Sequence, residues 1–353
     1  MNRSVAGTAE PRPITRILAI RFARLGDVIL VFPALARLRE AYPGARITLM
    51  TGLPCAPAAR LCPFVDETLA VDRLGMRDGP RLRAAGDIVR LIGEVRRGDF
   101  DLVVDFHSFR ETNLLAWFSG APLRLGLQRS DRAYLSFCFN IPPVPEDKSC
   151  HLAEMFMRVS DGAARIRRPD APEGDVGAFG PTIHVPDDLL ARVRARHLEG
   201  LADPGLLVAV YVGASVSSRR WPRGRFAAVA RHLLSESGAG VAILTGASPA
   251  EEQIGQEIAA AVNHPGRVRL LTELGIPELA AVIGSSRLLV SNDTGPMHIG
   301  PALGVPTLGI FSESEPRHYR PLGPADRYVR KPRIDDVTVE EVIETIEEMR
   351  AMG

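Results

Sequence analysis

The sequence lacks long apolar runs, an excess of charge of one sign and abundant cysteine, and each lack excludes a class of protein. No stretch approaches the roughly 20 consecutive apolar residues that a membrane-spanning helix needs. The first thirteen residues have no apolar core of the kind found in secretion signals, so we expect a cytoplasmic protein with a disordered tail over 1–13. Basic and acidic residues number 43 and 42, and this balance argues against a nucleic acid as the main partner.

Cysteine is scarce, and the four present are Cys55, Cys62, Cys138 and Cys150. They form no Cys-x-x-Cys pair, and none combines with histidine at a spacing typical of zinc sites. We therefore interpret them as free thiols and expect neither a bound metal nor a cofactor.

What the sequence does contain is an alternation of short apolar runs and amphipathic stretches. The apolar runs predict strands near 17–22, 46–51, 101–105, 207–212, 240–245, 287–291 and 306–310. The amphipathic stretches predict helices near 27–41, 81–97, 150–160, 222–236, 249–262, 276–284 and 295–303. This alternation indicates an α/β protein with parallel sheets. A chain of 353 residues has room for two domains, and the stretch 166–181, rich in proline and glycine, is interpreted as their linker.

The most informative stretch runs from Ser291 to His298, between a short apolar run and an apolar helix start. A strand, a polar turn and a helix start present free backbone N–H groups to an anion, and the helix dipole adds partial positive charge. Pro296 suits the first helical turn, where a missing N–H is no loss. Asp293 and Thr294 either cap the helix or touch a ligand, and His298 is near enough to reach the same ligand. A capped helix without any ligand is the alternative.

Two further patterns precede this turn along the chain. The first begins at Ile17 and contains Gly26-Asp27-Val28, with a helix end at Ala41-Tyr42-Pro43-Gly44. The second is Gly213-Ala214-Ser215 followed by Arg219-Arg220-Trp221-Pro222. Together with the 291–298 turn and the stretch 301–307, these patterns resemble glycosyltransferase family nine, the lipopolysaccharide heptosyltransferases, in the order that family shows.

The resemblance implies a GT-B fold, in which two Rossmann-like domains have parallel sheets facing a central cleft. We expect an acceptor-binding domain over 14–165, the linker over 166–181 and a nucleotide-sugar-binding domain over 182–330. In the segment 331–353 the apolar residues recur at helical spacing. GT-B proteins carry a C-terminal helix that crosses back to the N-terminal domain, and we expect the same of this segment.

The resemblance also implies a reaction: inverting, metal-independent transfer of a heptose or related sugar from an ADP-sugar, with ADP-heptose as the usual donor. The acceptor would be a lipopolysaccharide core or similar lipid-linked glycan, with peripheral contact at the inner membrane. Asp27 matches the family's catalytic aspartate and would take the proton of the acceptor hydroxyl. Asp27 lies where the first strand becomes a helix, so a simple helix cap is the alternative.

The remaining site residues rest partly on the same resemblance and partly on the charge and position of the residues themselves. Arg219 occupies a position where the family usually has lysine, and its charge would stabilise the departing diphosphate. Glu251 would accept hydrogen bonds from ribose hydroxyls, with Glu252 as a neighbouring candidate. The full donor set is Ser215, Arg219, Glu251, Asp293, Thr294, Gly295 and His298. For the acceptor we expect Arg24 and Arg129.

Other functions make different demands on the sequence. A metal-dependent transferase would use an Asp-x-Asp motif, but Asp99-Phe100-Asp101 directly precedes an apolar run and is interpreted as a strand entrance. A nicotinamide dehydrogenase would carry Gly-x-Gly-x-x-Gly after the first strand, where this chain has only Gly26. A nucleotide-sugar-binding protein without turnover and a sugar-nucleotide epimerase are the alternatives that remain open.

Overall fold

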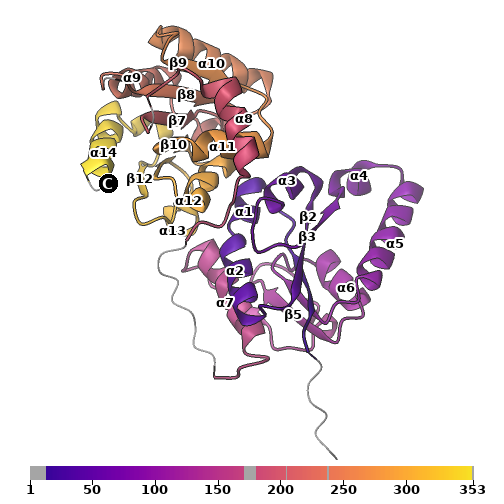
Figure 1. The fold of residues 1–353 in the computed structure, drawn as a ribbon. Helices are drawn as coiled ribbons and strands as arrows, with labels where there is room; N and C mark the ends of the chain where they lie inside the picture. The colour runs from indigo at the N-terminus through magenta and orange to yellow at the C-terminus, as the bar shows by residue number, and fades with distance from the viewer. Residues whose placement is uncertain (1–12, 171–179, 204, 237, 352–353) are drawn as a thin grey trace, which may run out of the picture.

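The computed structural model describes residues 13–170, 180–203, 205–236 and 238–351, and these form two domains (Figure 1). The first contains a six-stranded parallel sheet in the order β3-β2-β1-β4-β5-β6. Its strands are β1 (Arg16–Ile20), β2 (Arg46–Gly52), β3 (Glu67–Val71), β4 (Leu102–Asp105), β5 (Leu123–Gln128) and β6 (Val144–Pro145). The helices of this domain are α1 (Leu25–Ile29), α2 (Phe32–Ala41), α3 (Ala56–Ala59), α4 (Arg73–Asp78), α5 (Arg81–Arg97), α6 (Arg110–Phe118) and α7 (Leu152–Ala164).

The second domain repeats this topology with its own six-stranded parallel sheet, in the order β12-β11-β10-β7-β8-β9. Its strands are β7 (Leu207–Tyr211), β8 (Gly240–Leu244), β9 (Val268–Leu271), β10 (Leu288–Asn292), β11 (Thr307–Phe311) and β12 (Arg327–Arg330). Its helices are α8 (Asp187–Val193), α9 (Arg223–Leu233), α10 (Pro249–Val262), α11 (Ile276–Gly284), α12 (Ile299–Leu303), α13 (Pro316–Tyr319) and α14 (Val339–Ala351).

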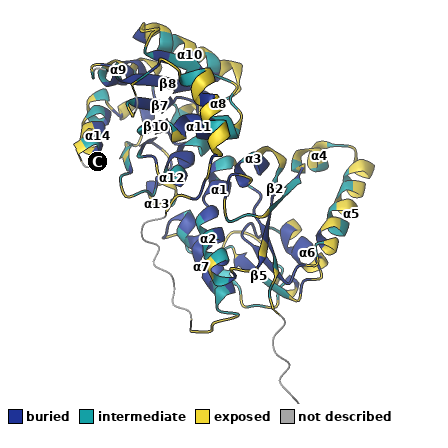
Figure 2. Ribbon diagram, viewed as in Figure 1, coloured by how far each residue is buried: buried dark blue, intermediate teal, exposed yellow. Residues whose placement is uncertain are grey.

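The strands are apolar because both faces of each sheet are covered by helices, as Figure 2 shows by the buried strands at the centre of each domain. In each sheet the strand order runs outward in opposite directions from a point between two central strands. That point lies between β1 and β4 in the first sheet and between β7 and β10 in the second. Ligands of open α/β sheets bind at the carboxyl ends of the strands beside this point. The topology therefore marks the ends of these four strands as the candidate site.

All seven predicted strands and all seven predicted helical regions are present, with two helices divided by proline. The helix expected over 27–41 is interrupted at residues 30 and 31, because Pro33 cannot donate to the carbonyl of Ile29 and its ring would clash with it. The region 295–303 begins as the 3₁₀ helix η5 (Gly295–His298) and continues as α12, which ends at Gly304 with φ +77°. Among the described residues, no helix is long and apolar enough to cross a membrane.

The expected return of the C-terminal helix to the first domain is wrong. Helix α14 packs against α9 and β12 of its own domain, where Val342, Ile346 and Met349 join the second core. The Nε1 of Trp221 donates to the carbonyl of Val337 over 2.8 Å and fixes the chain directly before the helix. The apolar residues at helical spacing therefore do form a packing face, but this face packs beside the second sheet.

Other segments join the two domains. The 3₁₀ helix η5 packs on α1, His184 N donates to the carbonyl of Leu61 over 2.8 Å, and a ring nitrogen of His318 lies 3.0 Å from the carbonyl oxygen of Cys150. Most of the expected linker, 171–179, and of the expected tail, 1–12, lies outside the described residues.

Candidate active site

The candidate site lies where the two domains meet, at the carboxyl ends of the central strands. Helix α1 follows β1 and carries Asp27, while η5 follows β10 and starts two residues after Asp293. Figure 1 shows α1 at the junction between the domains, beside the end of the second domain that holds α12. The two stretches that the sequence singled out are therefore neighbours in space, although more than 250 residues separate them in the chain.

Two glycines allow this approach. A Cβ atom on Gly26 would lie 2.6 Å from His298 Cδ2 and 3.2 Å from Gly295 Cα. A Cβ atom on Gly295 would lie 3.1 Å from the backbone nitrogen of Gly26. Larger residues at either position would push α1 away from η5. The Gly-Asp-Val pattern and the Gly-Pro pattern thus form the two sides of one contact.

Asp27 does not cap its helix. Arg24 is the N-cap of α1 and makes no side-chain capping bond, whereas Asp27 lies within the first turn. Its Oδ1 is 3.5 Å from Nη2 of Arg21, and its side chain is 28% exposed. The capping alternative is therefore not the arrangement found, and the carboxylate remains partly open at the domain junction.

Arg21 is a functional candidate that the sequence reasoning missed. The side chain is buried, its Nη1 donates to the carbonyl of Phe106 over 3.3 Å, and the guanidinium carbon lies 4.5 Å from the centre of the Phe156 ring. Burial lowers the pKa of Arg21 to about 10, while the charge of Asp27 raises it. Arg21 is still a cation at neutral pH and holds the Asp27 carboxylate in place.

Asp293 is held by side chains and does not act as a cap either. Its Oδ2 accepts from the hydroxyl of Ser314 and lies 3.2 Å from Nη1 of Arg219. Burial raises the pKa of Asp293, and the bond from Ser314 and the charge of Arg219 act in the opposite direction. Thr294 is the N-cap of η5 without a side-chain capping bond. The turn is therefore fixed by a polar network and not by helix capping.

Arg219 combines a fixed position with partial exposure. One nitrogen pairs with Asp293, the side chain is 35% exposed, and its Nε is buried without a hydrogen-bond acceptor among the described residues. Ser215 lies in the same loop after β7 and is exposed. Asn292 sets the position of this loop, because its Oδ1 accepts from Trp221 N over 3.0 Å and its Nδ2 donates to the carbonyl of Val212 over 2.8 Å. Asn292 is a second residue whose role the sequence did not reveal.

The structure separates the two glutamate candidates. Glu251 is buried at the ends of β7 and β8, where its Oε2 accepts from Gly246 N over 2.9 Å. A Cβ atom on Gly213 would lie 2.7 Å from the same oxygen. Glu252 instead accepts from Gln256 along the surface of α10. Of the two, Glu251 is the one that lies with the other predicted donor residues.

His298 and Tyr319 complete the junction. Burial lowers the pKa of His298 to about 4, so the ring is neutral at pH 7. Burial also raises the pKa of Tyr319, which feels the negative charges of Asp27 and Asp293 from opposite domains. Tyr319 is thus within electrostatic reach of both halves of the site. No periodicity or motif marks this residue, so it could not be identified from the sequence.

The two predicted acceptor residues lie in different surroundings. Arg24 is exposed at the start of α1, three residues before Asp27. Arg129 is half-buried, donates from Nε to the carbonyl of His107 over 2.7 Å, and places Nη1 3.2 Å from Oε1 of Glu146. Arg24 is therefore open to a ligand beside Asp27, whereas Arg129 is tied to a buried carboxylate.

The Asp-x-Asp motif lies at the opposite edge of the sheet, before the amino end of β4. Asp101 accepts from the backbone nitrogens of Thr15 and Arg16, which confirms its reading as a strand entrance. Among the described residues, no group of three or more histidine, cysteine, aspartate or glutamate side chains is placed to hold a metal ion.

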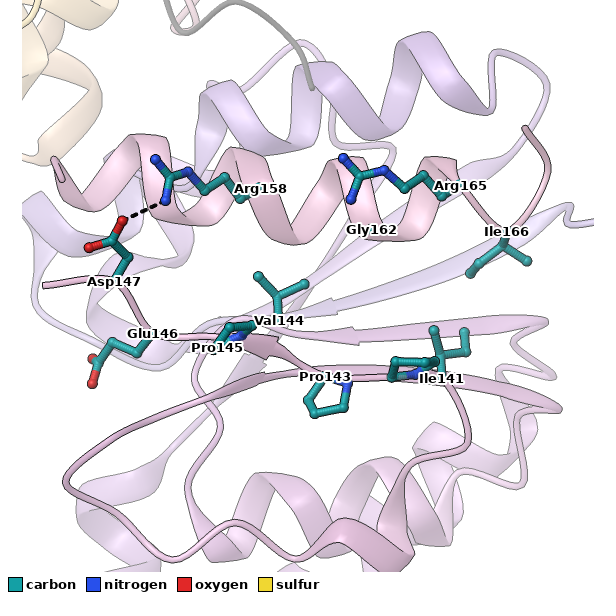
Figure 3. Close-up of a pocket in the computed structure, with 11 residues that line it drawn as sticks. Ile141, Pro143, Val144, Pro145, Glu146, Asp147, Arg158, Gly162, Arg165 and Ile166 are labelled. Atoms are coloured by element: carbon teal, nitrogen blue, oxygen red, sulfur yellow. Dashed lines mark hydrogen bonds and ion pairs between the residues drawn. The ribbon is translucent and has the colours of Figure 1, made fainter. Parts of the chain in front are cut away.

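A cavity of about 680 Å³ lies elsewhere in the first domain, between β6 and α7 (Figure 3). Three prolines, Pro142, Pro143 and Pro145, line its β6 side, and at one end Arg158 Nη1 donates to Asp147 Oδ2 over 2.6 Å. None of the predicted site residues lines it. We therefore do not identify this cavity as the reaction site, despite its volume.

The two parallel sheets with their paired strand-end site have the two-domain GT-B fold. A heptosyltransferase of Escherichia coli solved with ADP has a TM-score of 0.78 at 18% identity, covering 95% of this chain and 100% of that chain. The ADP-heptose lipopolysaccharide heptosyltransferase II of Escherichia coli has a TM-score of 0.78 at 21% identity, covering 96% and 99%.

The sequence comparisons agree with the fold. The model of glycosyltransferase family 9, described as heptosyltransferase, matches residues 88–344. Lipopolysaccharide heptosyltransferase 1 of Pseudomonas aeruginosa is 27% identical over 305 residues, which cover 85% of this chain and 79% of that relative. The chain belongs to glycosyltransferase family 9 and is a glycosyltransferase, as its motifs predicted.

Proposed function

We propose that this enzyme transfers a heptose from ADP-heptose to a lipopolysaccharide-core acceptor, with inversion and without a metal ion. The observation that carries the proposal is the partly open carboxylate of Asp27, next to the Gly26–Gly295 contact that joins it to the donor turn. ADP and ADP-heptose appear in the names of structures with the same fold. The names of related sequences supply the lipopolysaccharide acceptor.

The chemistry is a single displacement. The Asp27 carboxylate takes the proton of the acceptor hydroxyl while that oxygen attacks the anomeric carbon. The bond between the anomeric carbon and the diphosphate oxygen breaks on the opposite face, so the configuration inverts and ADP leaves with the bonding electrons. Arg21 holds the carboxylate in orientation throughout.

The diphosphate would lie over the loop after β7 and the turn after β10. Arg219 supplies a positive charge with one unpaired buried N–H, Asp293 fixes that guanidinium, and Ser215 adds an exposed hydroxyl. Fixed cations and N–H groups can stabilise a departing diphosphate in place of a metal ion. Thr294, Gly295 and His298 would lie beneath the bound diphosphate.

The acceptor would approach from the first domain. Arg24 beside Asp27 suits a phosphorylated or acidic glycan, and Arg129 orders the neighbouring loop through Glu146. Glu251 would bind the ribose of the donor on the other side. A lipid-linked acceptor implies an enzyme that works peripherally at the inner-membrane surface.

The proposal is tested with purified protein, a panel of ADP-, UDP- and GDP-sugars and a lipopolysaccharide core that lacks heptose. We expect ADP release only with ADP-heptose and acceptor together, and a product with inverted anomeric configuration by NMR. Activity should persist after exhaustive treatment with EDTA. Sugar isomerisation without acceptor would point to an epimerase, and loss of transfer in EDTA restored by magnesium or manganese would overturn metal independence.

A further inference from the structure

Helix α5 is unusually exposed for an element of a folded domain. Of its 17 residues, all within the described part of the chain, only Val95 is fully buried. Leu82 is 90% exposed and Val89 is 69% exposed, although leucine and valine side chains are normally inside. Figure 2 shows α5 along the outer edge of the first domain, with neighbouring α4, which has no buried residue. The outer face of these two helices, α4 and α5, is called the α4–α5 surface below.

The exposed residues of α5 are ordered in rows. Leu82 and Val89 are seven residues apart, which is nearly two helical turns, so they lie on the same side of the helix. Arg83, Arg90 and Arg97 also recur every seven residues and form an adjacent row. All five side chains are exposed. A helix with an apolar row beside an arginine row is typical of segments that lie in a membrane interface.

The charge of the α4–α5 surface differs from that of the whole chain. The segment 73–97 contains seven arginines against three acidic residues, whereas the complete chain has a net charge of only +1. Arg90 pairs with Asp87 and Arg77 with Asp78. Charge of one sign is therefore concentrated on the same two helices that expose apolar side chains.

An apolar groove lies beside this surface. It has a volume of about 590 Å³ and lies between α4, α5 and α6, with Ile88, Leu91 and Phe118 among its walls. Its inner end is formed by Phe22, which directly follows Arg21, and the guanidinium of Arg73 lies 5.0 Å from the centre of the Phe22 ring. The groove thus reaches Phe22, two residues after the end of β1.

We propose that the α4–α5 surface binds an anionic lipid bilayer. The arginine row would meet the lipid headgroups, and the Leu82–Val89 row would enter the boundary with the acyl chains. Charge complementarity selects this occupant, because the segment 73–97 has four more arginines than acidic residues and an anionic headgroup surface supplies charge of the opposite sign. The biological role of this inference rests on the proposed function, in which the acceptor is lipid-linked. Binding of the α4–α5 surface to a bilayer requires no sugar transfer.

The test is sedimentation of the full-length protein with vesicles of phosphatidylcholine alone or with 30% phosphatidylglycerol. We expect binding only to the anionic vesicles, weakening as salt is raised. Arg83→Glu with Arg90→Glu should reduce partitioning by at least about 25-fold, since each arginine near an anionic surface contributes about fivefold. The matched control is Arg192→Glu on α8 of the second domain, an exposed arginine that pairs with Asp188, and it should bind like wild type.

A second variant separates the apolar contribution. Leu82→Ser with Val89→Ser changes two exposed positions, so the fold should be retained, and it should weaken binding at both low and high salt. Equal binding of wild type and both double variants would overturn the proposal. The proposal would also be overturned if the wild type bound no vesicles and instead formed a dimer in analytical ultracentrifugation that the same substitutions dissociate.

Transfer to a water-soluble, delipidated acceptor distinguishes this inference from the proposed function. We expect the α4–α5 variants to keep wild-type rates with that acceptor, because none of the changed residues belongs to the site. If the wild type transfers sugar to it and ignores anionic vesicles, the membrane inference fails and the proposed function stands. If it binds vesicles without transferring heptose, only the proposed function fails.

Discussion

Replacing Asp27 by asparagine isolates the basicity of its carboxylate from its shape. Asparagine has the same size and keeps an oxygen that can accept from Arg21, but it cannot take a proton from a hydroxyl. A positioned general base contributes about 10²- to 10⁴-fold to a rate. Because Asp27 is not the cap of α1 and contacts no residue of the donor turn through its side chain, we expect kcat to fall by that factor while ADP binding stays near wild type.

The same substitution has a calculable structural cost. The variant loses the charge of an ion pair whose atoms are 3.5 Å apart, and a partly exposed ion pair contributes about 0.2–1 kcal/mol. Since the amide oxygen retains part of this interaction, the free energy of unfolding should fall by less than about 1 kcal/mol. Asp161→Asn is the matched control, because Asp161 Oδ1 lies 3.4 Å from Arg37 Nε on the far side of the domain.

The assay is single-turnover transfer with saturating ADP-heptose, accompanied by calorimetry with ADP and by urea unfolding of both variants. We expect Asp161→Asn to lose a similar amount of stability and no activity. A transfer rate of Asp27→Asn within about threefold of wild type would refute the assignment of the base. A drop in rate matched by an equal loss of folded protein would refute it as well.

Three further results are expected. Arg219→Ala should weaken ADP binding about 10- to 100-fold in calorimetry, whereas Arg223→Ala, an exposed arginine in the same domain, should not. Gly26→Ala would place a methyl group 2.6 Å from His298, so we expect about 1–3 kcal/mol less stability and slower transfer, in contrast to Gly44→Ala, whose methyl group meets nothing within 4 Å. The folded pKa of His298, about 4, is below its unfolded value of 6.5, so its contribution to stability is complete above pH 6.5 and is lost as pH falls towards 4. The difference in unfolding free energy between wild type and His298→Gln should therefore shrink by about 2 kcal/mol between pH 7 and pH 5 in urea titrations.

The sequence by itself determined the local structure and the chemistry offered at each strand end. Apolar runs bounded by glycine and proline predict buried parallel strands, because a strand covered on both faces has no polar side. Asp27, Asp293 and Glu251 could be named since each lies in the turn or first helical turn after such a run and matches the pattern of the family. The family could be named too, because its motifs are short and contiguous in the chain.

The tertiary structure decided which of these segments meet. The apolar stripe of α14 shows that the helix packs on something, but only the folded domain shows that the partner is α9 and not the first domain. Likewise, Arg21, Asn292 and Tyr319 are positioned or influenced by residues far along the chain, such as Phe106 and Phe156 around Arg21. A single sequence records the side chain at each position, whereas such contacts depend on how two sheets and their helices pack together in three dimensions.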